Sequence, residues 1–282
     1  MIVTELYREQ GFGNQLWMYA VVVSSARRLN CDFSILSFNR FKGAKFLKIN
    51  PGKPLKYKAS SKPTQILPPN IENYITDHEL SKNNYTDFIR TRSKIEGCFQ
   101  MEELVIENRN YFTEIFQVND EAFSANLENT CIINLRGGEY AGEPKLLIPV
   151  DYYYTSMEVM KSHNPKFEFK VVTDDPDLSK KYFPNIEVVS RPPRRPLSVQ
   201  VRFPNYKKIK YDFWLIQNAG GLILSNSSFS WWGAWTNTKV SKVIAPMFWG
   251  NFNEPSSGWQ PPNIFTKGWD FLDKNNHIET KK

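Results

Sequence analysis

With 282 residues, of which 41% are hydrophobic and 23% charged, the chain is long enough for two modest domains and is not disordered as a whole. No apolar run reaches the ~20 residues that span a bilayer, no secretory signal opens the chain, and three widely spaced cysteines fit neither a disulfide framework nor a zinc site, so we expect a cytoplasmic protein. The net charge of +7 favours an anionic partner.

The first 36 residues predict a strand, a helix and a second strand. Residues 2–7 form a short strand candidate, and after a glycine-bearing loop the apolar residues from Leu16 to Ala26 recur at helical spacing. Residues 31–36 predict the second strand. This order is typical of a βαβ unit and a parallel sheet. Residues 42–70 are rich in lysine and proline and predict a long excursion, whereas residues 72–128 predict mostly helix.

A second alternation of strands and helices starts near residue 130. The chain segments that predict it are strand 131–135, helix 152–161, strands 167–172 and 186–189, helix 212–219, strand 222–224 and helix 231–236. The sequence therefore predicts an α/β protein with two domains, residues 1–125 and 126–282.

Two segments carry the excess positive charge without any acidic residue between their cations. The cations are Lys42, Lys45, Lys48, Lys53, Lys56, Lys58 and Lys62 in the first, and Arg191, Arg194, Arg195, Arg202, Lys207, Lys208 and Lys210 in the second. Such runs are usually solvated faces. Two of them still favour a phosphate-bearing ligand, a nucleic acid or an acidic membrane surface.

A cluster of serines and an asparagine lies between the predicted strand 222–224 and the helix that follows. Four hydroxyls and the amide of Asn226 gather over residues 225–230. These residue types cap helices, which is one interpretation of the cluster. We favour a phosphate site, because ligands of α/β sheets bind where a strand ends and a helix begins.

Arg136 and a glycine pair follow the buried strand 131–135. Gly137 and Gly138 allow close approach of the backbone to a ligand, and a guanidinium matches a phosphate. An ordinary turn with an ion-paired arginine explains the segment equally well.

Three further patterns carry less weight. Gly11 and Gly13 form only part of a dinucleotide fingerprint, because Leu16 stands at the third glycine's place. Thr173-Asp174-Asp175-Pro176-Asp177 could bind a divalent metal, but a turn that starts a helix is the preferred interpretation. No histidine lies in a loop rich in glycine or serine, no Walker or nucleophile-elbow motif occurs, and no nucleic-acid-binding signature is present.

Together these segments resemble a known family. Residues 11–20, Gly-Phe-Gly-Asn-Gln-Leu-Trp-Met-Tyr-Ala, and residues 225–235, Ser-Asn-Ser-Ser-Phe-Ser-Trp-Trp-Gly-Ala-Trp, are similar to the opening motif and the serine motif of the α-1,2-fucosyltransferases. Gly97-Cys98-Phe99-Gln100 is similar to a third, shorter motif. The family's arginine motif is altered: Asn134 replaces its histidine, Gly137 its second arginine and Glu139 its aspartate, while Arg136 is kept.

The resemblance implies a two-domain GT-B glycosyltransferase in which two Rossmann-like domains face a cleft, without a metal or other cofactor. Residues 1–125 would take the acceptor and residues 126–282 the nucleotide sugar. The donor-binding residues that it implies are Asn14 and Arg136 on the diphosphate, Asn134 and Asp212 by the base, and Ser227, Ser228 and Phe229 on phosphate and base.

The resemblance also implies a catalytic base, for which Glu143 stands nearest to the expected place. Attack of a hydroxyl on the anomeric carbon needs such a base, and the departing diphosphate needs cations. Glu139, the nearer carboxylate to Arg136, is expected to pair with it, but it is also an alternative base, as is Glu9. Arg194 and Arg195 could assist the leaving group.

The leading hypothesis is thus an inverting glycosyltransferase that moves L-fucose from GDP-fucose to a glycan hydroxyl in α-1,2 linkage. Alternatives are a transferase of the same fold that uses another nucleotide deoxysugar, such as a rhamnose donor, and a metal-dependent transferase that uses Asp175 and Asp177. A further alternative is a non-catalytic glycan-binding module with Trp231 and Trp232 as a sugar platform. Expected partners are the nucleotide sugar and an acceptor glycan that could be lipid-linked, with no nucleic acid. The basic segments could hold the protein at the inner membrane face.

Overall fold

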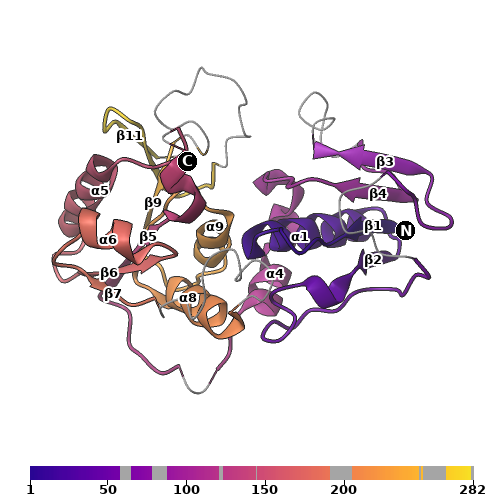
Figure 1. Ribbon diagram of the computed structural model, residues 1–282, viewed down its shortest axis with the longest axis horizontal. Helices are drawn as coiled ribbons and strands as arrows, with labels where there is room; N and C mark the ends of the chain where they lie inside the picture. Colours follow the sequence, from indigo (N-terminus) through magenta and orange to yellow (C-terminus); the bar gives the residue numbers. More distant parts are fainter. Residues whose placement is uncertain are drawn as a thin grey trace. The chain divides into compact units, whose positions relative to one another are not determined.

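The computed structural model describes residues 1–57, 65–77, 88–120, 123–143, 145–190, 205–247, 249 and 265–280. These residues form two compact units, the first ending at Gln117 and the second starting at Val118 (Figure 1). Each unit has its own sheet of mainly parallel strands covered by helices, so the predicted α/β class with two Rossmann-like domains is confirmed. Within the described ranges, no helix is both long enough and apolar enough to cross a membrane.

The first unit is built on a four-stranded parallel sheet in the order β2-β1-β4-β3. Its strands are β1 (Ile2–Glu5), β2 (Phe33–Leu36), β3 (Asn73–Thr76) and β4 (Ser93–Glu96). Helix α1 (Phe12–Arg28) connects β1 to β2, as the sequence predicts, and α4 (Arg109–Phe116) ends the unit. The stretch of α1 from Leu16 to Val23 is buried on every side, so this helix is part of the core.

Strands β3 and β4 lie where the sequence predicts mostly helix, and that prediction is wrong. Strand β4 is fully covered, yet Lys94 and Glu96 are polar. Lys94 lies 3.4 Å from Glu5 of the neighbouring strand β1. A central parallel strand is usually an apolar run, and because β4 carries these buried charged residues its sequence does not show that pattern. Among the described residues from 89 to 120, helix is confined to α4 and two short 3-10 helices.

The second unit is built on a seven-stranded sheet in the order β11-β10-β9-β8-β5-β6-β7. Its strands are β5 (Thr130–Leu135), β6 (Glu168–Thr173), β7 (Glu187–Val188), β8 (Gly221–Ile223), β9 (Lys242–Pro246), β10 (Asp270–Leu272) and β11 (Ile278–Thr280). All neighbours are parallel except β10 and β11. The chain order runs outward from β5 toward β7 and then resumes at β8 on the other side, which makes the β5–β8 pair a topological switch point.

Within the described residues, four helices of the second unit connect these strands. They are α5 (Val150–His163), α6 (Pro176–Tyr182), α8 (Tyr206–Asn218) and α9 (Ser228–Trp235). The strand and helix predictions for this half are confirmed in type. However, α8 begins six residues earlier than predicted, where Asn205 caps it by accepting a hydrogen bond from the Lys208 amide at 3.2 Å. Tyr152, Tyr153 and Met160 of α5 pack into the core that β5, β6 and β8 share.

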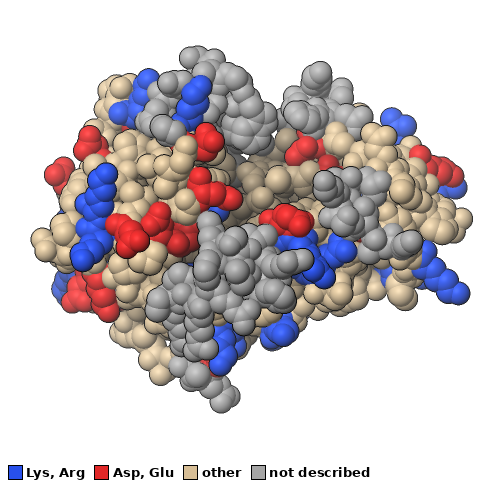
Figure 2. Space-filling view, viewed as in Figure 1, with Lys and Arg blue, Asp and Glu red and all other residues tan. Residues whose placement is uncertain are grey.

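Several described cations of the two basic segments are buried or form ion pairs. Lys42 is buried and donates to the Gln10 carbonyl at 2.6 Å, while Lys208 and Lys210 lie in α8 and pair with Asp212 and Asp120. On the face shown in Figure 2, cationic and anionic side chains are mixed on both units. Residues 191–204, which include Arg191, Arg194, Arg195 and Arg202, lie outside the described residues, as do Lys58 and Lys62.

Candidate functional site

The candidate site lies at the carboxyl ends of β5, β6 and β8 in the second unit. Arg136 and Gly137 follow β5, Asp174 follows β6, and Ser225 to Ser227 follow β8. Since β5 and β8 are neighbours at the switch point, two segments that lie ~90 residues apart in the chain meet at one edge of the sheet. Ligands of doubly wound α/β folds bind at this edge.

A buried hydrogen bond joins the two segments. The Ser225 hydroxyl donates to the Asn134 side-chain oxygen at 2.7 Å, and both side chains are almost completely buried. Next to it, the Asn226 amide donates to the Leu146 carbonyl at 2.8 Å. Asn134, Ser225 and Asn226 therefore serve to fix the loops, and the Ser227 end of the cluster is the part left at the surface.

Helix α9 presents its first turn at this edge. Ser227 is its N-cap residue, but the Ser227 side chain accepts no hydrogen bond from the first turn, whose backbone N–H groups therefore lack the usual side-chain cap. Ser227, Ser228 and Phe229 are half-buried, and Phe229 packs on Phe213 of α8 with ring centroids 5.5 Å apart. An uncapped N-terminus flanked by hydroxyls is suited to an anion.

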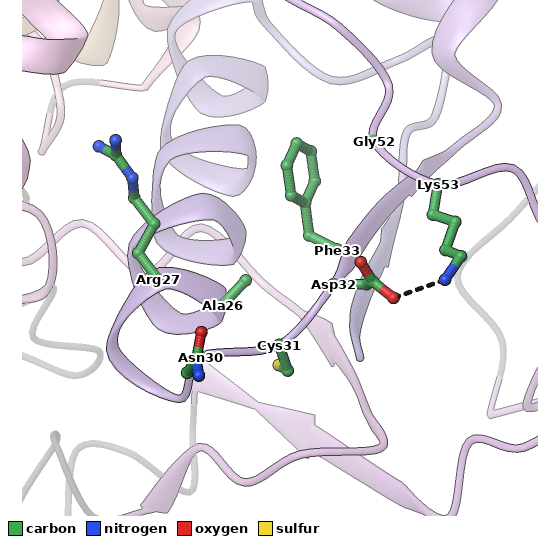
Figure 3. A pocket seen from close by; sticks show the side chains of 8 residues that line it. All are labelled: Ala26, Arg27, Asn30, Cys31, Asp32, Phe33, Gly52 and Lys53. Carbon is green, nitrogen blue, oxygen red and sulfur yellow. Dashed lines mark hydrogen bonds and ion pairs between the residues drawn. The ribbon is translucent and has the colours of Figure 1, made fainter.

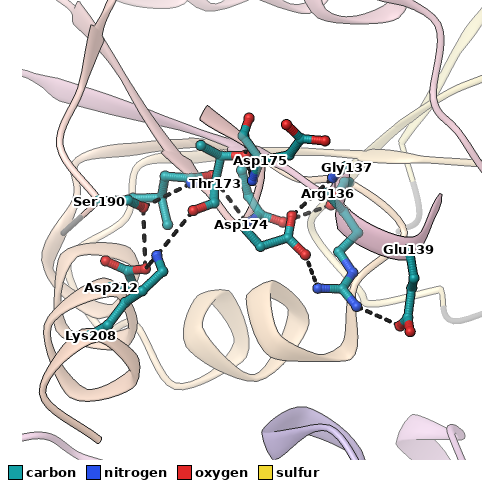
Figure 4. A network of polar contacts seen from close by, with 12 residues as sticks. Arg136, Gly137, Glu139, Thr173, Asp174, Asp175, Ser190, Lys208 and Asp212 are labelled. Atoms are coloured by element: carbon teal, nitrogen blue, oxygen red, sulfur yellow. Dashed lines mark hydrogen bonds and ion pairs between the residues drawn. The ribbon is translucent and has the colours of Figure 1, made fainter. Parts of the chain in front are cut away.

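Arg136 is held between two carboxylates, as Figure 4 shows. Its guanidinium pairs with Asp174 on one side and with Glu139, at 2.7 Å, on the other. Burial alone would lower the pKa of Arg136, but the negative charges of Asp174 and Glu139 outweigh it and raise the pKa above its ordinary value. The predicted ion pair with Glu139 is present, and the Arg136 side chain remains 30% exposed.

Asp174 is the residue that sequence reasoning missed. Besides pairing with Arg136, its carboxylate accepts a hydrogen bond from the Gly137 amide at 2.9 Å. The adjacent Asp175 caps α6 by accepting from the Leu178 amide at 3.0 Å, which confirms the turn and helix start predicted for this acidic segment. Because the segment has the sequence of an ordinary helix start, the sequence did not indicate that Asp174 also pairs with Arg136.

The glycine pair has a structural cause in the same turn. A Cβ atom on Gly137 would lie 2.5 Å from the Cβ of Asp175, and Gly138 adopts a φ of +38° with Asp174 beside it. The close approach that these glycines permit is thus that of the β6–α6 turn.

Asp212 lies farther along the same polar network. Its carboxylate pairs with Lys208 one helical turn earlier and accepts a hydrogen bond from the Ser190 hydroxyl at 3.2 Å. Lys208 in turn donates to the Thr173 carbonyl at 3.0 Å, directly before Asp174 (Figure 4). This network connects α8 to the carboxyl end of β6 and holds Asp212 in a buried position.

The candidate bases differ in their surroundings. Glu139 is 69% exposed and engaged with Arg136, whereas Glu143 ends the short 3-10 helix Gly138–Gly142 and is exposed. Among the described residues, the Glu143 carboxylate makes no hydrogen bond or ion pair. Glu9 is exposed in the first unit.

Asn14 belongs to the first unit and lies in the first turn of α1. Its side-chain oxygen accepts a hydrogen bond from Gln100 at 3.0 Å, so the structure joins the motif at residues 11–20 to the Gly-Cys-Phe-Gln segment. Gln15 fixes the loop by donating to the Arg40 carbonyl at 3.1 Å and accepting from the Lys42 amide at 2.9 Å. Asn14 is therefore held at the carboxyl edge of the first sheet, beside the end of β4.

Two predictions about other ligand groups have outcomes in the structure. The sugar platform of Trp231 and Trp232 is wrong, because both rings are fully buried and pack on each other at right angles with centroids 5.0 Å apart. In the part of the chain that the structure describes, no three or more histidine, cysteine or acidic side chains are grouped so that they could hold a metal ion.

The chain is similar in sequence to known proteins. No protein-family model matches the chain. It is 31% identical over 174 residues to an α-1,2-colitosyltransferase of Escherichia coli, with 57% of each chain covered. It is 24% identical over 205 residues to the O-antigen biosynthesis glycosyltransferase WbnK of Escherichia coli, with 66% of this chain and 65% of the relative covered. The matches thus span less than two thirds of either relative.

Among solved structures, the α-1,6-fucosyltransferase NodZ soaked with GDP-fucose is 15% identical, with a TM-score of 0.44 and coverage of 93% of this chain and 99% of that one. NodZ from Bradyrhizobium gives the same identity and TM-score. At this distance the likeness transfers no residue role.

The chain is thus similar to proteins of the glycosyltransferase class. Both curated relatives are named as sugar transferases, which is the class of protein that the motifs of the sequence predict.

Proposed function

We propose that the protein is a glycosyltransferase that uses a nucleotide sugar and inverts the configuration at its anomeric carbon. L-Fucose from GDP-fucose is the favoured donor group and a glycan hydroxyl the acceptor, in α-1,2 linkage. The observation that carries the proposal is the meeting of the arginine and serine motifs at the switch point of the second sheet, where the Ser225–Asn134 hydrogen bond fixes both loops.

The described residues supply the chemistry that transfer requires. The acceptor oxygen bonds to the anomeric carbon, its proton passes to a base, and the bond from that carbon to the diphosphate oxygen breaks with its electron pair. In this proposal, Arg136 and the first turn of α9 would stabilise the charge that develops on the diphosphate. A single displacement of this kind converts a β-linked donor into an α-linked product.

We assign the base to Glu143, because it is the carboxylate on this loop that Arg136 does not engage. Asp212 is the candidate for reading the base edge of the nucleotide, held in place by Lys208 and Ser190. Ser227, Ser228 and Phe229 would contact phosphate and base. For Asn14, contact with the sugar diphosphate stays a prediction that rests on the resemblance of its motif alone.

A second donor is favoured by one comparison. The relative that is 31% identical is named for transfer of colitose in α-1,2 linkage. A nucleotide-linked colitose is therefore the alternative donor, and the α-1,2 linkage is common to both proposals.

A thermal-shift screen tests the proposal. GDP, UDP, dTDP and their sugars are added to the intact protein, since a ligand that binds only the native state raises the melting temperature. Stabilisation by one nucleoside diphosphate, followed by product formation with its sugar, is expected. A protein that none of these ligands stabilises would not be a nucleotide-sugar transferase.

A further inference from the structure

Lys208 is a buried cation at the candidate site. It lies in the first turn of α8, where its ammonium donates to the Thr173 carbonyl at 3.0 Å and pairs with Asp212 one turn later (Figure 4). A lysine is rarely so buried without a partner. These two contacts therefore determine where the Lys208 side chain can lie.

Burial sets this ion pair apart from pairs at the protein surface. The Lys53–Asp32 pair lies in the wall of a hollow of about 590 Å³ where α1 ends and β2 begins (Figure 3), and its side chains are 61% and 56% exposed. Water and salt screen such a pair, so it holds its partners weakly. The side chains of Lys208 and Asp212 are only 11% and 6% exposed. Their attraction is screened much less, and the loss of one partner is costly there.

Lys208 joins α8 to the carboxyl end of β6. Because Lys208 and Asp212 are four residues apart on one helix, the helix fixes their spacing. The bond to Thr173 then fixes this pair against the last residue of β6. A second connection runs beside it: the Thr173 amide donates to the Ser190 hydroxyl at 2.8 Å, and that hydroxyl donates to Asp212 at 3.2 Å. The place of the Asp212 carboxylate relative to β6 thus depends on Lys208.

The same end of β6 carries the arginine side of the site. Asp174 directly follows Thr173 and pairs with Arg136. Contacts within the second unit therefore connect the proposed diphosphate contact to the proposed reader of the base, and Lys208 lies between them (Figure 4). A nucleotide spans both ends with one covalent framework. It binds best when the two protein groups are already held at a matching separation.

We propose that Lys208 is a positioning residue that determines which nucleotide base the site accepts. It acts through the Asp212 carboxylate, which it holds where the edge of the base is to be read. The inference rests on the proposed function, in which Asp212 reads that edge, and it adds the residue on which the selectivity depends. A carboxylate can accept hydrogen bonds from the ring N–H and the 2-amino group of guanine. A site built for these donors discriminates against a base that lacks one of them.

Titration with GDP and inosine diphosphate tests the proposal, because inosine diphosphate lacks only the 2-amino group. Calorimetry on the intact wild type should give a preference of about tenfold for GDP. Lys208→Met keeps the length of the side chain but removes its charge, so it should lose most of this preference. Lys210→Met is the matched control, because Lys210 lies in the same helix and pairs with Asp120 instead. Circular dichroism checks the fold of each variant, and Lys208→Gln, which keeps a hydrogen-bond donor, replaces Lys208→Met if that variant does not fold.

A second comparison separates positioning from direct contact with the base. In the Asp212→Asn background the preference should already be low, and Lys208→Met should change it no further. A further change there would mean that Lys208 contacts the base itself, which overturns the positioning role. A full preference for GDP in folded Lys208→Met, or an equal loss in Lys208→Met and Lys210→Met, also overturns the proposal.

The wild type alone separates this inference from the proposed function. If it binds GDP and inosine diphosphate equally well, Asp212 does not read the 2-amino group and the inference is wrong, while a transferase that uses a nucleotide sugar remains. If it binds neither nucleotide, the proposed GDP-linked donor is wrong and the inference with it.

Discussion

Arg136 is oriented by two carboxylates and is also the proposed contact for a diphosphate. Asp174 and Glu139 flank its guanidinium, so a diphosphate has to compete with carboxylates that are already in contact. Asp174 has the stronger hold, because it also accepts a hydrogen bond from the Gly137 amide. The pair orients the arginine at the cost of weakening its attraction for an anion.

This competition predicts the effect of Asp174→Asn. The amide keeps the hydrogen bond from Gly137 but removes a negative charge beside the guanidinium, so we expect GDP to bind roughly threefold to tenfold more tightly, or ~0.7–1.4 kcal/mol. Calorimetric titration measures the change. Glu139→Gln removes the same charge at a more exposed position and should have a smaller effect. Weaker binding by Asp174→Asn would show that the ion pair is needed in the bound state.

Glu143 provides a second test at the residue scale. If it is the base, Glu143→Gln should reduce kcat about 10²-fold or more and leave donor affinity unchanged, because the proton is removed only in the transition state. Glu139→Gln should instead change donor affinity, by the small increase expected from the loss of a charge beside Arg136. Normal turnover by the first variant, together with loss of turnover at full donor affinity by the second, would exchange the two roles.

At the scale of elements, the site depends on a hydrogen bond between the ends of β5 and β8. Ser225→Ala leaves the buried Asn134 oxygen without its donor, and we expect the free energy of unfolding to fall by about 1–2 kcal/mol in chemical denaturation. Ser227→Ala is the matched control: this half-buried serine makes no cap, so stability should stay within ~0.5 kcal/mol while nucleotide binding weakens. The reverse order of effects would place the ligand contact at Ser225.

The elements differ in how strongly the local sequence predicts them. Strands β5 and β8 were predictable because buried parallel strands are mainly apolar runs, and α1 because its loop and apolar spacing are strong local signals. Strand β4 was not, since Lys94 is buried against Glu5, a residue 89 positions away in the chain. The Arg136–Asp174 pair was hidden for the same reason: it forms only after β5 and β6 are side by side.

At the scale of the whole molecule, buried phenols in both units link stability to pH. Burial, with Glu96 and Glu5 nearby, raises the pKa of Tyr7, and burial raises the pKa of Tyr152 and Tyr153 in the second unit. A raised pKa means that the folded protein keeps protons that the unfolded chain loses above about pH 10, so stability is complete below that pH and falls as pH rises beyond it.

Denaturation midpoints between pH 8 and about pH 11 would measure this loss. We expect a flat profile up to about pH 10 and a decline above it, with a shallower decline in Tyr57→Phe, which removes a phenol of pKa about 12. A profile that is flat to the highest pH would show that these phenols ionise as easily in the folded protein as in the unfolded chain.

The central claim is that Arg136 recognises the diphosphate of a nucleotide at the switch point of the second sheet. Calorimetric titration of the wild type and Arg136→Ala with GDP and with guanosine tests it most directly, because the two ligands differ only in the diphosphate. The wild type should bind GDP at least tenfold more tightly than guanosine, and Arg136→Ala should lose most of that preference while binding guanosine as before. An Arg136→Ala variant that keeps the full preference for GDP would contradict the claim.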